Sequence, residues 1–439
     1  MSTTTENNRL VGLVTAISLV MASMVGTGVF TSLGYQAIGI NSTFALLFLW
    51  FIGGIYALCG ALSYGELAAV MPRSGGEYQY LSKIYHRAVG FLSGWLSVTV
   101  GFAAPIALAA IALGQYTNIV IPVIPAKAIA LITVISVSLI HTRNLKMGSN
   151  FQDIFTILKI ALIAIFIVCG FLLATPQPVD IIPDNDGIDQ IFSSSFAVSL
   201  VYVTYAYSGW NAAIYLAGEI KNPEKNLPRS LFVGTAIVMV LYLLVNFIFL
   251  YATPFSSIQA LEDKEKIAAL AAEYIFGETG GKIISLLIAF GLISTISAMV
   301  WAGPRVTQVI GEDIPFFALL GKKNSRGIPY YAILLQLFIV LVLLLTSSFE
   351  DVMTYLGFTL ILSSFFTVLG LFIHRWRYPH LTRPYKTWGY PLTPIVFLGI
   401  SLWVLIYVFT DKPFQSVAGL TTIMIGLPIY FLASKQKLA

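Results

Sequence analysis

Long apolar stretches without alternation are the feature that most limits what this chain can fold into. About twelve of them follow one another, starting near residues 10, 43, 89, 126, 151, 196, 231, 282, 330, 352, 390 and 417. A helix needs about 20 apolar residues to cross a bilayer, whereas a strand of a membrane barrel needs about 10 in alternation. Only 10% of the residues are charged, against about 25% in a soluble domain. The pattern predicts an all-α integral membrane protein with about 12 transmembrane helices.

Basic residues are distributed unequally between the two sides of the predicted membrane. With a cytoplasmic N-terminus, nineteen Lys and Arg residues, Arg305 among them, fall in the tails and the cytoplasmic loops. Five fall on the other side, which instead carries acidic residues such as Asp186 and Glu262. Lys and Arg in short loops favour the cytoplasmic side. We therefore expect a multi-pass protein of the inner (cytoplasmic) membrane with both termini in the cytoplasm.

Two of the predicted spans are interrupted by residues that weaken a helix. The first span, about residues 10–40, contains "MASMVGTGVF" with Gly26, Thr27 and Gly28 at its middle, and the sixth contains "YAYSGWNA", Tyr205 to Ala212. Glycine destabilises a helix interior by about 1 kcal/mol relative to alanine. Unpaired backbone groups in hydrocarbon cost several more, unless they line a cavity or pack against protein.

An opened helix offers free N–H groups to an anion and free carbonyl groups to a cation, so a zwitterionic amino acid fits both. The two interruptions lie five spans apart, and spans one and six therefore cross the membrane in opposite directions. Small residues in one membrane helix also permit close helix packing, which is the alternative explanation for either stretch alone. Two interruptions at matched positions favour inverted repeats with a transport site at the membrane midplane.

Three motifs resemble those of the amino acid–polyamine–organocation (APC) permeases, in particular bacterial relatives of the L-type amino-acid transporters. They are "GTGVF", "PRSGGEYQYL" and "YAYSGWNAAIYLAGEIKNPEKNLPRS". The resemblance covers the chain up to about Arg377. It implies a leucine-transporter-like 5+5 inverted repeat within a single transporter domain, 1–439. The first repeat would span 10–174, the second 193–377, and two additional helices 390–435.

The resemblance also implies a substrate site made of backbone. The substrate carboxylate would meet the amides of Gly26, Thr27 and Gly28, and its ammonium would meet carbonyls near Ser23, Met24, Tyr205 and Ser208. Tyr205, Tyr207 and Trp210 would gate or shape the side-chain pocket. The substrate-binding residues expected on this basis are Ser23, Met24, Val25, Gly26, Thr27, Gly28, Tyr205, Tyr207, Ser208, Gly209 and Trp210.

Lys159 lies in the middle of the fifth span, in "DIFTILKIALIAIFI". A buried ammonium costs several kcal/mol unless it is paired or deprotonated. Some family members that do not use sodium resemble this chain in carrying a lysine here, where a sodium ion sits in sodium-coupled relatives. We expect Lys159 to hold the carbonyls of the first span and to be the coupling residue, whether as a brace alone or also as a proton carrier.

Other polar residues of the predicted spans are less informative. Glu66 is expected to form a structural or gating pair, and Glu219 to lie at the membrane interface. Ser294, Thr295 and Ser297 could line the cavity or bond to their own helix. No carboxylate is expected in the pocket, and Ala298 stands where cation carriers of the family have a large aromatic residue. Both points favour a neutral substrate.

The sequence thus predicts a secondary transporter of neutral L-amino acids, independent of sodium, acting by alternating access as an exchanger or a proton symporter. The alternative is a cationic amino-acid or polyamine transporter, and an ion channel or a membrane enzyme is more distant. We expect no catalytic residue, cofactor, metal site or nucleic-acid partner. The partners are an amino-acid substrate and membrane lipids, with protons left open. The loop "TNIVIPVIPAK" lacks the cysteine that links L-type transporters to a partner, so no disulfide-linked subunit is expected.

Overall fold

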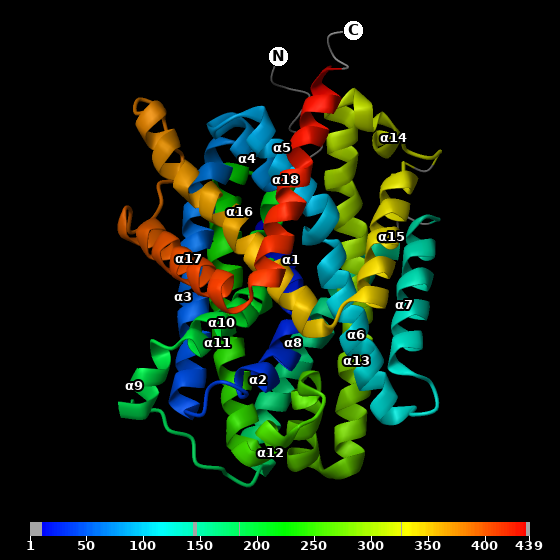
Figure 1. Cartoon of the computed structure of the whole chain (residues 1–439), viewed down its shortest axis with the longest axis vertical. Coiled ribbons are helices and arrows are strands. Elements are labelled where there is room, and N and C mark those ends of the chain that lie inside the picture. Colours follow the sequence, from blue (N-terminus) through cyan, green and yellow to red (C-terminus); the bar gives the residue numbers. More distant parts are fainter. Residues whose placement is uncertain (1–10, 144–146, 184, 326, 436–439) are drawn as a thin grey trace.

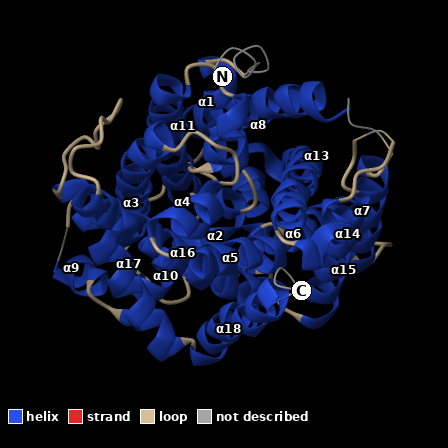
Figure 2. Ribbon diagram, turned by 90° about the horizontal axis from the view of Figure 1, so that it is seen from above, coloured by secondary structure: helices blue, strands red, loops and turns tan. Residues whose placement is uncertain are grey.

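The computed structural model describes residues 11–143, 147–183, 185–325 and 327–435. The predicted cytoplasmic termini, and Arg9, Lys146, Arg326 and Lys437 of the charge count, lie outside these residues. All named elements of the described chain are helices (Figure 2). The first half contains α1 (Leu13–Met24), α2 (Gly28–Gln36), α3 (Thr43–Val70), α4 (Gly76–Ile84), α5 (Arg87–Leu96), η2 (Ser97–Gly101), α6 (Ala103–Val120), α7 (Ala126–His141) and α8 (Met147–Leu173).

The second half contains long helices as well. It contains α9 (Asn185–Ile191), α10 (Ser194–Ala206), η3 (Ala212–Glu219), α11 (Pro223–Ala252), α12 (Phe255–Ala260), η4 (Lys264–Lys266), α13 (Ile267–Asp313), η5 (Pro315–Phe317), α14 (Ala318–Gly321), α15 (Tyr330–Thr346), α16 (Phe349–Arg377), α17 (Leu392–Asp411) and α18 (Pro413–Lys435). The predicted repeat boundaries fall between elements, since α8 ends at Leu173 and α10 begins at Ser194.

Eight of the described helical segments are long and apolar enough to cross a membrane, and four shorter apolar helices accompany them. Seen along the bundle axis, α7, α15, α17 and α18 lie at the periphery, while α2, α10 and α16 lie near the centre (Figure 2). Burial follows the same order: 67% of the most apolar stretch of α3 is buried, against 28% in α17 and 22% in α18. The outer helices therefore expose apolar side chains around the bundle, as expected in lipid.

Both predicted interruptions are present in the structure. Residues 25–27 separate α1 from α2, and α10 ends at Ala206, followed by a turn with Gly209 at φ 98° and then by η3. The first helix stops because Gly26 and Gly28 leave the backbone weakly constrained, and the chain resumes as α2 at Gly28. The sixth span stops at the positive φ of Gly209, a conformation that glycine adopts without steric cost.

Two contacts join the interrupted segments to each other. The hydroxyl of Tyr242 on α11 donates to the carbonyl of Met24 at 2.7 Å and lies 3.1 Å from the carbonyl oxygen of Ala206. This one hydroxyl therefore contacts the last carbonyl of α1 and the last carbonyl of α10. Beyond the other end of each segment, the Val11 amide donates to the Glu219 carbonyl at 3.0 Å, and the Lys221 amide donates back to Val11 at 2.9 Å.

The connecting elements divide between the two ends of the bundle. In Figure 1, α4 and α14 lie at the upper end, whereas α9 and α12 lie at the lower end. This separation is the one that the charge distribution predicts. Between α3 and α5, the short helix α4 is mostly buried, including Glu77, Tyr80 and Ile84. It turns inward because Gly75 (φ 121°) and Gly76 (φ 55°) reverse the chain directly after α3.

Candidate substrate site

A cavity of about 420 Å³ lies between the two interrupted helices and the helices α5, α6, α13 and α16. It extends from Ser23 on α1 and Ser208 after α10 to Ser74, Glu219 and Gln308. Glu219 is exposed, so the cavity opens at the end of the bundle where α4 lies. A volume of this size lies within the range of about 300–1,000 Å³ typical of small-molecule sites.

The opposite end of the bundle is closed over the cavity. A β-carbon built on Gly34 of α2 would lie 2.0 Å from the carbonyl oxygen of Lys264, so the backbone of η4 rests directly on α2. The Tyr35 hydroxyl donates to Glu265 at 3.0 Å. The Tyr116 hydroxyl of α6 lies 2.8 Å from the carbonyl oxygens of both Phe30 and Glu265. Among the described residues, the cavity is therefore open toward the end where α4 lies and closed toward η4.

Lys159 reaches the opened first helix from α8. Its ammonium donates to the hydroxyl of Thr295 on α13 at 2.7 Å and to the carbonyl of Val25 at 3.2 Å, and the side chain is 4% exposed. These two oxygen partners replace part of the hydration that the buried ammonium loses. The side chain thus joins α8, α13 and the interruption between α1 and α2.

The predicted substrate residues divide into two groups in the structure. Five line the cavity: Ser23, Tyr205, Ser208, Gly209 and Trp210. The other six are not among its lining residues: Met24, Val25, Gly26, Thr27, Gly28 and Tyr207. Tyr207 instead packs against Trp50 and Tyr242. The Met24 and Val25 carbonyls already accept hydrogen bonds from Tyr242 and Lys159.

Tyr205 separates the cavity from the start of α2. Its hydroxyl oxygen lies 2.5 Å from the hydroxyl oxygen of Thr27, which is buried. The first amides of an α-helix have no partner within the helix, and here Tyr205 lies between those of α2 and the cavity. Tyr205 thus both lines the cavity and contacts the residue directly before α2.

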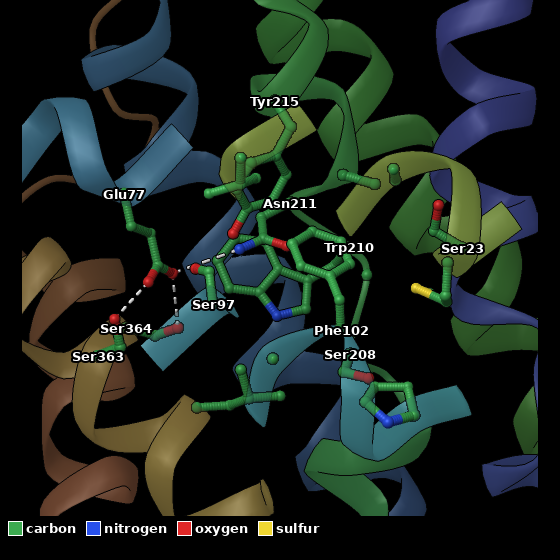
Figure 3. Close-up of a pocket in the computed structure, with 18 of the residues that line it drawn as sticks. Ser23, Glu77, Ser97, Phe102, Ser208, Trp210, Asn211, Tyr215, Ser363 and Ser364 are labelled. Carbon is green, nitrogen blue, oxygen red and sulfur yellow. Dashed lines mark hydrogen bonds between the residues drawn. The ribbon is translucent and has the colours of Figure 1, made fainter. Parts of the chain in front are cut away.

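Glu77 is a cavity residue that sequence reasoning missed (Figure 3). Its Oε1 accepts from Tyr64 at 2.5 Å, Ser364 at 3.2 Å and Asn211 at 3.4 Å, and its Oε2 accepts from Ser363. The prediction that no carboxylate lies in the pocket is therefore wrong. The motif "SGGEY" held the signal, because two consecutive glycines can turn a chain inward and carry the next residue with it.

Further residues of the eighth and sixth spans also differ from expectation. Arg305, counted with the loops, is partly buried in α13 and lines the cavity with Ala298, because α13 continues as a helix to Asp313. Glu219 is exposed, in agreement with the interfacial position expected for it, and in addition lines the cavity mouth. Thr295 and Ser297 are not among the residues that line the cavity, and each contacts a side chain of another helix. Thr295 accepts from Lys159, and Ser297 lies 2.8 Å from Nε2 of His141.

Glu66 forms the expected pair near the end of α3. Its carboxylate accepts from Arg375 Nε at 2.9 Å and from Arg375 Nη2 at 2.5 Å. Arg383 lies 3.1 Å away, and the amide and hydroxyl of Thr387 donate at 2.7 and 2.8 Å. The buried carboxylate therefore joins α3, α16 and the segment before α17, and it does not line the cavity.

Comparison with known proteins agrees with this architecture. The sequence model of the amino acid permease family matches residues 11–433. The serine/threonine exchanger of Bacillus subtilis (strain 168) is 30% identical over 99% of both chains. The human large neutral amino acids transporter small subunit 2 is 27% identical over 96% of this chain and 80% of its own length. The human b(0,+)-type amino acid transporter 1 is 26% identical over 99% of this chain and 90% of its own. The chain is thus a member of the amino acid permease family and a multi-pass membrane protein that transports amino acids.

Proposed function

We propose that the chain carries neutral L-amino acids across the inner membrane by alternating access, without sodium. The observation that carries this proposal is the juxtaposition of two interrupted helices at one cavity, with the Lys159 ammonium donating to the Val25 carbonyl at the first interruption. A cavity open at one end and closed at the other by η4 corresponds to one of the two states that alternating access requires.

Twelve spans fit the described helices as part of this proposal. Eight described segments are long enough by themselves, and four shorter apolar helices bring the total to twelve: Ala126–His141, Ile157–Leu173, Ser194–Ala206 and Tyr330–Thr346. At about 1.5 Å per residue, the 13 residues of α10 are too short to cross alone, and η3 continues the span. The order of elements supports two five-helix repeats followed by α17 and α18, with α4 and the segment of α12 and η4 in matching positions.

The substrate carboxylate and ammonium would bind where α1 and α10 open. Ser23, Ser208 and Gly209 line the cavity there, and the amides at Gly26, Thr27 and Gly28 lie behind Tyr205. Substrate binding would exchange the hydrogen bond between Tyr205 and Thr27 for contacts with the carboxylate. Trp210 would bound the side-chain pocket.

A neutral substrate remains the best-supported class even though Glu77 lines the cavity. Three donors already occupy one oxygen of that carboxylate and Ser363 occupies the other, which leaves little capacity for a cationic side chain. The names of the related serine/threonine exchanger and large neutral amino acids transporter agree with this class. The b(0,+)-type relative keeps cationic amino acids as the alternative.

Transport by purified protein in liposomes tests the proposal. Radiolabelled L-serine, L-threonine, L-leucine and L-lysine are supplied outside, with the unlabelled amino acid inside or absent and with sodium or choline as the cation. We expect uptake of at least one neutral amino acid, equal in sodium and choline, and faster with amino acid inside if the protein exchanges. Strict dependence on sodium would contradict the role of Lys159, and uptake of lysine alone would establish the cationic alternative.

A further inference from the structure

Glu77 is a buried carboxyl group at the edge of the cavity, without a cationic partner among the described residues. The side chain is 6% exposed, and none of the ion pairs among the described residues includes it. Its carboxylate is instead surrounded by the hydroxyls of Tyr64, Ser363 and Ser364 and the amide of Asn211. A buried carboxylate without a counter-ion is costly, and the usual response is to bind a proton.

The surroundings of Glu77 can satisfy either protonation state. A hydroxyl both donates and accepts, so Tyr64, Ser363 and Ser364 can donate to the carboxylate, and one of them can turn to accept from the carboxylic acid. A lysine or arginine partner would instead fix the ionised form. Burial raises the pKa of Glu77 above its ordinary value, although the hydroxyls of Ser363, Tyr64, Ser364 and Ser93 oppose that rise.

A hydroxyl chain connects the carboxyl to the helix opposite. Ser363 of α16 contacts Oε2 of Glu77, and its hydroxyl oxygen lies 3.3 Å from that of Ser93 on α5, which also lines the cavity. A proton can pass from cavity water to Ser93 while the Ser93 hydroxyl proton moves to Ser363 and the Ser363 proton moves to Oε2. One proton enters, one is held on Glu77, and the reverse order releases it.

The other titratable groups that face Glu77 are tyrosines, which stay neutral over the physiological range. They are Tyr56 and Tyr64 from α3, Tyr80 from α4 itself and Tyr215 from η3. The elements α5 and α16 present only the serines already named. Two charged groups line the same cavity farther along, Arg305 of α13 and Glu219.

We infer that Glu77 is a proton-binding site of the transport cycle, distinct from Lys159. The protonation state of Glu77 controls how firmly α4 and α16 are bound to the interrupted sixth span. The link to that span is the donation from Asn211, in the turn between α10 and η3, to Oε1. A protonated carboxyl is a weaker acceptor than a carboxylate, so protonation loosens this link and eases movement of the turn. The inference rests on the proposed transport function.

The test is the pH dependence of exchange in liposomes by the full chain. The probe is whichever of L-serine, L-threonine or L-leucine the parent protein carries fastest, with the same unlabelled amino acid inside and equal pH on both sides, over about pH 5 to 8. We expect the parent rate to rise as the pH falls through one midpoint, and the rate of Glu77→Gln to stay at the low-pH level throughout. Equal pH profiles for the two proteins would overturn the inference.

A matched variant separates proton binding from structural support. Tyr64→Phe removes one donor to the carboxylate and leaves the carboxyl in place, so the midpoint should move to higher pH by about one unit, a tenfold change in proton affinity. Glu77→Asp should keep a midpoint at another pH. If both variants change the rate without moving the midpoint, Glu77 is only a structural link.

Infrared difference spectroscopy gives a reading that does not depend on transport. The parent protein should show the C=O band of a protonated carboxylic acid that disappears as the pH rises, and the band should be absent in Glu77→Gln. If Glu77→Gln does not fold, the test is whether the pH midpoint of this band moves to higher pH in Tyr64→Phe. If the parent carries no amino acid but the band titrates, the proposed function fails while the proton site stands. If no band titrates, the proton site itself is wrong.

Discussion

The ammonium of Lys159 lies 2.7 Å from the hydroxyl oxygen of Thr295, a hydrogen bond that joins α8 to α13 behind the opened first helix. The same ammonium holds the Val25 carbonyl. Replacing Lys159 by alanine leaves that carbonyl buried and unpaired, at a cost of about 1–3 kcal/mol. We expect initial uptake rates to fall by about tenfold or more.

Thr295→Val is the matched control for this prediction, because it removes one partner of Lys159 and leaves the ammonium on Val25. Uptake should fall by less than in Lys159→Ala. Parental transport by Lys159→Ala in liposomes would show that the lysine is not needed at the interruption.

Gly28 and Gly26 should differ sharply when each is replaced by alanine. A β-carbon on Gly28 would lie 2.4 Å from the Cα of Ala206, a backbone atom that cannot move aside alone. Overpacking of this kind costs about 1–3 kcal/mol. On Gly26 the nearest atom is the Cγ2 of Thr295 at 3.5 Å, an ordinary contact. Thermal melting in detergent should show Gly28→Ala destabilised and Gly26→Ala close to the parent, and the reverse order would contradict the packing of α2 on α10.

The proposed orientation can be tested by labelling single cysteines. Asp186 lies in α9 and Lys323 directly after α14, at opposite ends of the bundle (Figure 1). In a protein lacking Cys59 and Cys169, a membrane-impermeant maleimide should label a cysteine at position 186 from outside and one at position 323 only after the membrane is opened. Labelling of both from outside would rule out the twelve-span arrangement.

Glu66 should contribute far more to stability than an exposed acidic residue with a similar ion pair. Its side chain is 0% exposed and is paired with Arg375 and Arg383. Removing one partner of a buried pair costs about 3–5 kcal/mol, because the remaining charges stay buried. In Glu350→Gln, by contrast, the lost pair with Lys412 is 36–38% exposed and is worth about 0–1 kcal/mol. Unfolding measurements on Glu66→Gln and Glu350→Gln should show this difference, and equal losses would contradict it.

Stability should also depend on pH through Glu77. Burial raises the pKa of its carboxyl in the folded protein, so the folded state binds the proton more tightly than the unfolded chain does. Glu77 therefore stabilises the fold most below its unfolded pKa, and this contribution is lost as the pH rises through the folded pKa. The melting temperature of the parent should decline with rising pH more steeply than that of Glu77→Gln. Parallel curves would show that the pKa of Glu77 does not differ between the folded and the unfolded state.

The sequence predicted the helical class and both helix interruptions because each depends on local composition. Runs of apolar residues and the glycines around Thr27 can be identified directly in the sequence, without knowledge of how the helices pack. The place of Glu77 was not predicted, because it depends on how α4 packs between α3 and α16, and the two glycines before it only permit that turn. Likewise, Tyr205 was expected in the pocket, but its contact with Thr27 requires knowing how α10 lies on α2. Arg305 was misplaced because an apolar stretch and a helix need not end at the same residue.

The backbone pairing of Val11 with Glu219 and Lys221 has a consequence for how this protein can be handled. It ties the residues just before the first described helix to the end of the interrupted sixth span. A reporter domain fused close to Val11 would strain these two backbone hydrogen bonds and restrict the movement of both segments. The outer helix α18, of whose most apolar stretch 22% is buried, is the better carrier for a fluorescent or affinity label.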